Sequence, residues 1–225
     1  HPGQEQKAAW LQVRRYKPDY VFLTGWGVMN QVAIKEAAAI RFPMDHFIGN
    51  WWSGAEADVL PAGKSAIGYI AATFNQPGAG TQAHGDIVKH VYGGDNAAAN
   101  KAQIGQVLYN RGIINAIYDT EAVRTAMGKY GNTAMSGEQV RWGLENLNLT
   151  EARIAELGVK GFMGPISISC ANHEGGGKVM FQQWSGTEWK IVKGWTDTMQ
   201  DMIRPMIEEA AAAFAKENKI TPRKC

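Results

Sequence analysis

The fold is decided by residues 17–49, which read KPDYVFLTGWGVMNQVAIKEAAAIRFPMDHFIG. Lys-Pro-Asp at residues 17–19 breaks any preceding helix, and residues 20–23 then form a short apolar run, typical of a strand buried in a parallel sheet. Apolar residues at helical spacing predict a helix over 29–40, and residues 46–49 predict a second short strand. A strand, a helix and a second strand in this order indicate a right-handed parallel crossover, and hence an open α/β sheet.

The flanking segments continue this alternation of helices and strands. The mixed segment 4–15 predicts a helix before the first strand, and residues 67–74 predict a third strand. Residues 56–62 fit one helical turn between the second and third strands. A long helical tract is expected from about residue 97 to residue 130, because its apolar residues fall on one stripe.

The later part of the chain carries helix caps and two more apolar segments. Ser136 and Gln139 have the spacing of a capping box, and Thr150 is placed to cap a further helix. Residues 162–169 and 178–183 are most simply two strands joined by a glycine-rich loop.

Two elements are expected to close the chain. The sequence WSGTEW at residues 184–189 predicts the turn of a hairpin. Pro205 suits the first turn of a final, alanine-rich helix that reaches about residue 216.

Composition narrows the class of protein. The 225 residues weigh 24.6 kDa and are 45% hydrophobic, which predicts a soluble globular chain of one or two domains. A formal charge of +2 offers no broad cationic field for a phosphate backbone, so we expect no nucleic-acid partner. No apolar run approaches the length that spans a bilayer. The sequence starts at His1 without a secretory leader, and we therefore interpret His1 as an internal or processed start.

Motifs of catalysis and metal binding are incomplete. Residues 62–65, Ala-Gly-Lys-Ser, resemble the end of a phosphate-binding loop, but Asp58 occupies the position of its first glycine. His84 and His90 are six residues apart, a spacing that does not place two metal ligands on one helical face. Neither the Gly-x-Ser-x-Gly motif of hydrolases nor a dinucleotide-binding Gly-x-Gly-x-x-Gly motif is found. We therefore expect no catalytic residue, no metal and no cofactor.

Aromatic residues gather where the three predicted strands end. In a parallel sheet these ends share one edge, so we expect an aromatic-walled cleft in which nearby polar side chains orient a ligand. The alternative is that the tryptophans simply pack between helices. The aromatic residues are Trp26, Trp51, Trp52 and Phe74, and the polar ones are Thr24, Asn50 and Ser53.

The two cysteines leave two interpretations open. Cys170 and Cys225 could form one bridge in an oxidising compartment, which would tie down the tail of the chain. In a reducing cytosol they would stay unpaired thiols.

The order and spacing of several segments are familiar. Together they resemble the branched-chain amino-acid (Leu/Ile/Val) type of periplasmic substrate-binding protein of ABC transporters, and the resemblance extends through nearly the whole chain. The segments are YKPDYV at 16–21, GWG at 25–27, FIGNWW at 47–52, GFMGPI at 161–166, HEGG at 173–176 and QWSG-x-x-W at 183–189.

The resemblance implies a two-lobed type I periplasmic-binding-protein fold. In that family two α/β lobes, with open and mostly parallel sheets and flanking helices, are joined by three crossovers and close on a ligand like a hinged trap. The chain resembles only the later half of the family. This predicts that residues 1–103 form most of the second lobe, that 104–182 return to the first lobe, and that 183–225 form a crossover hairpin and the C-terminal helix and tail.

The resemblance also implies ligand contacts. Loops after the first two strands supply second-lobe contacts in the family, and the long helix would bring Gln106 and Tyr109 near the hinge and the cleft. The family's acidic contact to a ligand amino group has no counterpart in the loop at residues 50–52, which favours a ligand that is larger, aromatic or without a free ammonium group. The predicted ligand contacts are Thr24, Gly25, Trp26, Asn50, Trp51, Trp52 and Tyr109.

The resemblance implies that the protein binds a ligand and catalyses no covalent reaction. The chain is expected to belong to a periplasmic solute-binding protein that captures an amino acid or an aromatic or amide-like compound and delivers it to the membrane permease of an ABC transporter. An oxidising periplasm favours a bridge between Cys170 and Cys225. Two alternatives remain, a ligand-sensing domain of a receptor or regulator with the same fold, and an α/β enzyme acting at the same rim.

Overall fold

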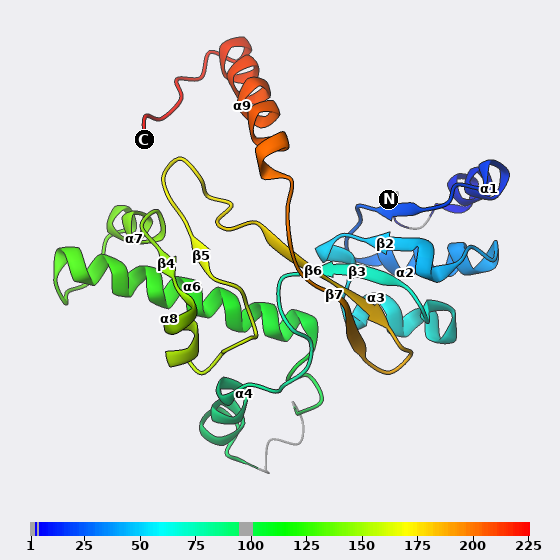
Figure 1. Cartoon of the computed structure of the whole chain (residues 1–225), viewed down its shortest axis with the longest axis horizontal. Coiled ribbons are helices and arrows are strands. Elements are labelled where there is room, and N and C mark those ends of the chain that lie inside the picture. Colours follow the sequence, from blue (N-terminus) through cyan, green and yellow to red (C-terminus); the bar gives the residue numbers. More distant parts are fainter. Residues whose placement is uncertain (1–2, 4, 95–100) are drawn as a thin grey trace. The chain divides into compact units, whose positions relative to one another are not determined.

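The computed structural model describes residue 3, residues 5–94 and residues 101–225 (Figure 1). The sequence predicts one helix to begin at residue 4 and another to begin near residue 97. Both of these positions lie outside the described residues. The chain forms two compact units, and each is described by itself. Unit 1 comprises His1–Ile117, Thr150–Gly164 and Val179–Trp195, and unit 2 comprises Tyr118–Leu149, Pro165–Lys178 and Thr196–Cys225.

Unit 1 is built on a five-stranded sheet in the order β1-β2-β3-β6-β7. The first three strands are parallel, and β6 pairs with β3 in the antiparallel sense. The predicted mostly parallel, open α/β sheet is thus confirmed, as is the hairpin formed by β6 and β7. The strands are β1 (Val21–Leu23), β2 (Phe47–Gly49), β3 (Ile70–Thr73), β6 (Lys178–Trp184) and β7 (Trp189–Asp197).

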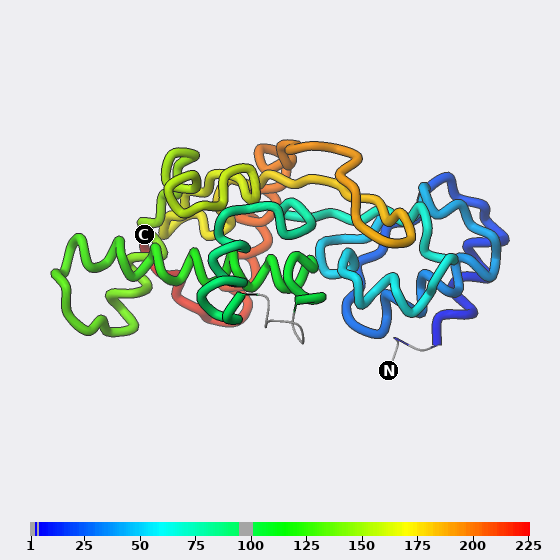
Figure 2. The backbone as a smooth tube through the Cα atoms, turned by 90° about the horizontal axis from the view of Figure 1, so that it is seen from below, coloured from blue at the N-terminus to red at the C-terminus, as the bar shows by residue number. Residues whose placement is uncertain are grey.

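Helices of unit 1 connect and flank these strands, and the segment from β1 to β3 is the blue and cyan part of the chain in Figure 2. The first helix ends at Tyr16 because Lys17, which precedes a proline, adopts a left-handed conformation with φ of 49°. The helices are α1 (Lys7–Tyr16), α2 (Val28–Ala39), α3 (Glu56–Val59), α4 (Gln82–Asp86), α8 (Glu151–Glu156) and the start of α6 (Val107–Tyr130), with short 3-10 or π segments at Met44–His46, Trp51–Ser53, Leu60–Ala66 and Ile87–Val91.

The core of unit 1 lies on one face of its sheet. Alternate strand residues point to opposite faces of the sheet, and the face that carries Phe47 is buried. The Phe47 ring packs edge-on against Trp10 and Tyr69, with ring centroids 5.0 and 5.1 Å apart. Phe22, which points to the other face, is 76% exposed. The helices therefore stabilise one face of the sheet through an aromatic cluster.

A turn interrupts the helical tract that the sequence predicts, and α6 itself begins after this turn. Residues 102–106 form the turn, and Gly105 adopts a φ of 91° that a helix does not contain. The first helical N–H, that of Val107, donates to Glu56 Oε2 at 3.0 Å. A carboxylate on α3 thus fixes the beginning of α6.

Unit 2 contains a small two-stranded sheet, of β4 (Asn148–Leu149) and β5 (Ile166–Ser167), together with α7 (Gly137–Leu144), α9 (Gln200–Glu217) and the end of α6. The capping box of Ser136 and Gln139 is confirmed. The helix α7 packs closely on α6, because a Cβ on Gly143 would lie only 2.1 Å from the Ala122 carbonyl oxygen.

Two predictions for the later part of the chain are wrong. The expected strand 162–169 shrinks to Ile166–Ser167 and pairs with β4, because Pro165, which lacks an N–H, interrupts the run. The last helix starts before Pro205, since the carbonyl of Met199 already accepts the N–H groups of Met202 and Ile203.

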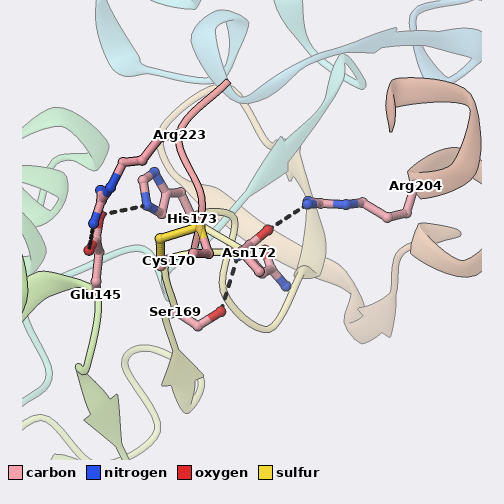
Figure 3. The surroundings of a disulfide bond; sticks show 9 residues. Glu145, Ser169, Cys170, Asn172, His173, Arg204 and Arg223 are labelled. Carbon is pink, nitrogen blue, oxygen red and sulfur yellow. Dashed lines mark hydrogen bonds and ion pairs between the residues drawn. A yellow bond between two sulfur atoms is a disulfide. The ribbon is translucent and has the colours of Figure 1, made fainter. Parts of the chain in front are cut away.

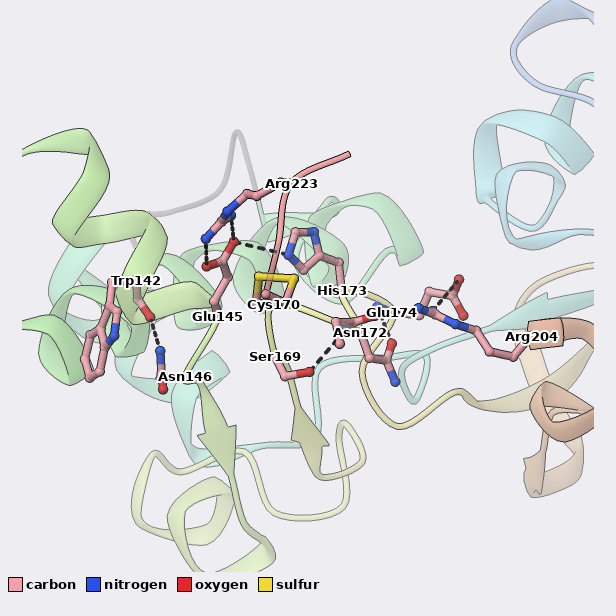
Figure 4. A network of polar contacts seen from close by, with 12 residues as sticks. Trp142, Glu145, Asn146, Ser169, Cys170, Asn172, His173, Glu174, Arg204 and Arg223 are labelled. Carbon is pink, nitrogen blue, oxygen red and sulfur yellow. Dashed lines mark hydrogen bonds and ion pairs between the residues drawn. A yellow bond between two sulfur atoms is a disulfide. The ribbon is translucent and has the colours of Figure 1, made fainter. Parts of the chain in front are cut away.

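The C-terminal tail is held by a disulfide and an ion pair. Cys170 and Cys225 are bonded, with their Cα atoms 5.4 Å apart (Figure 3). Beside the bond, Arg223 makes a two-pronged contact with Glu145, and His173 Nε2 lies 3.4 Å from the same carboxylate (Figure 4). The hydrogen bond from Arg223 holds the pKa of Glu145 below its ordinary value. The predicted bridge between Cys170 and Cys225, which ties down the tail of the chain, is thus confirmed.

Candidate ligand-binding site

The carboxyl ends of β1, β2 and β3 form one rim of unit 1. The register pairs Leu23 with Gly49 and Gly49 with Ala71, so the three strands end at the same edge of the sheet. The N–H of Asn50 donates to the carbonyl of Leu23 at 3.0 Å, which joins the first two loops directly. Ligands of open α/β sheets bind at such edges.

The second loop of the rim is held by its own polar side chains. Asn50 Oδ1 accepts the N–H of Trp52 at 3.0 Å, which starts the 3-10 turn Trp51–Ser53. The Ser53 hydroxyl lies 2.8 Å from Asn50 Oδ1 and 3.0 Å from the carbonyl oxygen of Gly25. Ser53 is fully buried, so it maintains the loop and is not available to orient a ligand as the sequence suggested.

The rim tryptophans are exposed to solvent. Trp26, Trp51 and Trp52 are 60, 39 and 52% exposed, and Thr24 is also exposed. The ring of Trp51 lies 5.5 Å from that of Phe74, centroid to centroid. These exposures do not fit the alternative that the tryptophans simply pack between helices, since each ring presents surface to solvent at the rim. The aromatic-walled cleft itself remains a prediction.

A cationic side chain, which the sequence analysis did not identify, contacts two of these tryptophans. Arg111, in the second turn of α6, donates from Nη2 to the carbonyl of Trp51 at 2.8 Å. Its guanidinium carbon lies 5.3 Å from the ring centroid of Trp52, a cation–π contact. Sixty residues separate Arg111 from Trp51, and no local pattern reports a contact over that distance.

A second side chain holds the neighbouring carbonyl. The Asn30 amide donates to the carbonyl of Trp52 and to Asp58 Oδ1, both at 2.8 Å. Asp58 Oδ2 in turn accepts the N–H of Ala55 at 2.9 Å. Burial raises the pKa of Asp58 and lowers that of Arg111, whose positive charge acts on the same carboxylate. The tryptophan loop is thus fixed by polar contacts from α2, α3 and α6.

Three other residues that the sequence placed at or near the site have distinct surroundings. Tyr109 Oη lies 3.3 Å from Tyr92 Oη, and burial together with this hydrogen bond raises the pKa of Tyr109 to about 12. Gln106 donates to the carbonyl of Ala102. Gly25 is buried under the rim. Contacts of these residues with a ligand remain predictions.

Other features bear on what the chain can bind. A hollow of about 230 Å³ in unit 1 lies away from the tryptophans, between residues 76–81 and residues 160–162. Within the described ranges, no three His, Cys, Asp or Glu side chains gather as metal ligands would. None of the helices in the described part of the chain is both long and apolar enough to cross a membrane.

Comparison with known proteins now adds to this geometry. A family model described as periplasmic binding protein matches residues 1–188. The chain belongs to the periplasmic binding protein family. This confirms the resemblance to periplasmic binding proteins seen in the sequence, and solved structures similar to the chain include a branched-chain amino-acid ABC transporter and a leucine-binding protein. No functionally curated protein matches the sequence.

Solved structures agree with the family. One from the Pseudomonas fluorescens group, described as an ABC transporter permease, is 44% identical, with a TM-score of 0.90 over 100% of this chain and 54% of that chain. A branched-chain amino-acid ABC transporter protein from Thermus thermophilus with bound valine is 18% identical, with a TM-score of 0.67 over 89% of this chain and 52% of the other. A solute-binding protein from R. palustris in complex with benzoate is 14% identical, with a TM-score of 0.59 over 87% and 49%. The chain thus spans about half the length of these structures.

Proposed function

We propose that this chain is part of an extracytoplasmic solute-binding protein that captures a small organic ligand and presents it to the permease of an ABC transporter. The observation that carries the proposal is the exposed aromatic rim at the ends of three parallel strands, held in place by hydrogen bonds to Trp51 and Trp52. Such a surface removes apolar ligand area from water while changing no covalent bond. The chain corresponds, in this proposal, to the later half of a two-lobed protein, and closure of the lobes buries the ligand.

The proposed ligand is aromatic or amide-like, without a free ammonium group. Thr24, Trp26, Trp51 and Trp52 line the rim loops and supply no carboxylate for an ammonium ion. The charged group that touches the tryptophans is Arg111, a cation. The valine and benzoate bound by related structures show that this fold accepts both aliphatic and aromatic guests.

The proposed location is the periplasm. Family membership and the bond between Cys170 and Cys225 support an oxidising compartment. A ligand-sensing domain with the same fold is the alternative, and a covalently attached output domain would distinguish it.

Native mass spectrometry of the full-length protein tests the function, because a co-purified small molecule appears as added mass. Replacing Trp51 and Trp52 together by alanine should weaken binding of that molecule by about 2–4 kcal/mol in titration calorimetry, the size expected when binding aromatic residues are truncated. Trp195→Ala is the matched control, because Trp195 is 37% exposed but belongs to β7. Equal affinity of the double variant and the control would refute the site.

A further inference from the structure

Arg111 is a partly buried cation that lacks an ionic partner. Its Nη2 donates to the carbonyl of Trp51 at 2.8 Å, whereas Nη1 is buried and has no hydrogen-bond partner in the described ranges. The ion pairs found in the described part of the chain do not include Arg111. Burial of a charge is costly unless the charge is paired, so an unpaired guanidinium at a binding surface indicates an anion as its partner.

The acidic side chains of α3 are engaged with other groups. The charge of Asp58 acts on Arg111, but both oxygens of this carboxylate accept hydrogen bonds from N–H groups. Glu56 Oε2 accepts the N–H of Val107, in the first turn of the helix that carries Arg111. The nearby carboxylate therefore offsets part of the positive charge, and hydrogen-bonding capacity of the guanidinium remains for a ligand.

The position of Arg111 is fixed by the residue before it. Asn110 is fully buried, and its amide donates to the carbonyls of Gly78 at 2.9 Å and Gly105 at 3.2 Å. Its Oδ1 lies 2.9 Å from His84 Nε2. These contacts hold the first turns of α6 against the loop after β3 and against α4. A cation that is already held in place loses little freedom when an anion binds, which favours affinity.

The loops of the rim supply aromatic rings and no charge. None of the three loops contains Asp, Glu, Lys or Arg. They read TGWG at 24–27, NWWSGA at 50–55 and FNQPGAGT at 74–81. Arg111 contacts the carbonyl of Trp51 and the ring of Trp52, so a flat ring stacked on either indole lies beside the same guanidinium. Guanidinium and carboxylate groups are both planar and can form two parallel hydrogen bonds.

We propose that Arg111 determines the specificity of the rim and that the ligand is an aromatic carboxylate. The inference rests on the proposed function, because it names the ligand class of the same site. An amino acid fits these residues less well, since its ammonium group would meet a cation at the rim and no carboxylate in the loops. A neutral amide of the same shape would leave the guanidinium without a counter-charge.

Pairs of probes that differ only in charge test this inference in the full-length protein. The pairs are benzoate with benzamide and phenylacetate with phenylacetamide, measured by titration calorimetry at neutral pH. At least one carboxylate should bind about tenfold or more tightly than its amide, because hydrogen bonds to charged groups are stronger than neutral ones by about this factor.

The outcomes separate this inference from the proposed function. An amide that binds as tightly as its carboxylate would overturn the inference and leave the proposed function standing. Absence of binding by all four probes would overturn the inference as well, and native mass spectrometry decides separately whether the protein binds another small molecule. The comparison of probes in the wild-type protein needs no variant.

Substitutions of Arg111 give a second readout, the ratio of the affinities for a carboxylate and its amide. Arg111→Gln removes the charge and should lower the affinity for the carboxylate about tenfold or more, with the affinity for the amide little changed. Arg111→Lys keeps the charge without the planar fork and should retain part of the preference. Arg14→Gln is the matched control, because Arg14 is exposed on α1 and its loss changes the net charge equally. An unchanged ratio in Arg111→Gln would show that Arg111 only maintains the tryptophan loop, and would overturn the inference.

Discussion

The two units of the molecule are stabilised in different ways. Unit 1 buries Phe47, Tyr69 and Trp184 completely, around a five-stranded sheet. Unit 2 has strands of only two residues, and its tail is held by the bond between Cys170 and Cys225 and by ionic contacts. Small sheets bury too little apolar surface to be stable alone. Covalent and ionic links therefore add to the apolar packing of Leu147 and Leu149 in unit 2, whereas unit 1 is stabilised mainly by its apolar core.

The largest expected effect is in unit 1. Phe47→Ala removes a ring that packs against Trp10 and Tyr69, and should destabilise the unit by about 4–5 kcal/mol. Hydrogen exchange, followed by mass spectrometry, should show faster exchange in β1–β3 and α2, with α7 and β4 changed less. Phe22→Ala is the control, because that ring is exposed and its loss should cost little. An equal increase of hydrogen exchange in both units of Phe47→Ala would show that the Phe47 cluster does not stabilise unit 1 selectively.

Removing the disulfide should lower the stability of unit 2. The bond joins residues 55 apart, and the chain-entropy model gives a loss of about 4 kcal/mol when both cysteines are changed to alanine. Urea unfolding monitored by hydrogen exchange should show the loss in α9 and the loop around Cys170, with β1–β3 unaffected. Wild-type protein treated with a reductant should behave in the same way. Unchanged exchange in α9 would show that Arg204 and Arg223 suffice to hold it.

The smallest effect is a contrast in pH dependence. The pKa of Glu145 in unit 2 is lowered by Arg223, so its contribution is present at neutral pH and is lost as the pH falls through the folded pKa. The pKa of Asp58 in unit 1 is raised by burial, so protonation on acidification favours the folded state.

As the pH falls from the ordinary glutamate pKa of 4.5 through the lower folded pKa of Glu145, unit 2 should therefore lose protection, while the surroundings of Asp58 do not. Exchange rates corrected for the intrinsic effect of pH measure this. The control is Glu145→Gln, which should remove most of the pH response of unit 2. A variant that responds as strongly as wild type would assign the response to another group.

Local patterns in the sequence predicted the elements that depend on neighbouring residues. The strand, helix and strand over residues 20–49 form as expected, because their apolar periodicity is local. The caps at Ser136 and Thr150 also form as expected, since each bonds an N–H three residues on. The position of Trp51 and Trp52 directly after a parallel strand also follows from local sequence.

Contacts between distant residues were not predictable in this way. The pairing of β5 with β4 depends on tertiary structure, and so does the position of Arg111 beside Trp51. By sequence alone, Pro205 fits the first turn of the last helix. The backbone hydrogen bonds to the Met199 carbonyl show that the helix begins earlier. The candidate site was thus found through its aromatic residues, whereas the side chains that fix it became visible only in the fold.

The contact between Arg111 and Trp52 has an optical consequence. A positive charge over an indole shifts the energy of its excited state, so emission from Trp52 depends on the distance to the guanidinium. Since Arg111 belongs to α6, a displacement of the first turns of that helix away from Trp52 should alter the emission of this ring. Trp52 is thus an intrinsic fluorescent reporter beside the rim, to be read apart from the other seven tryptophans of the chain.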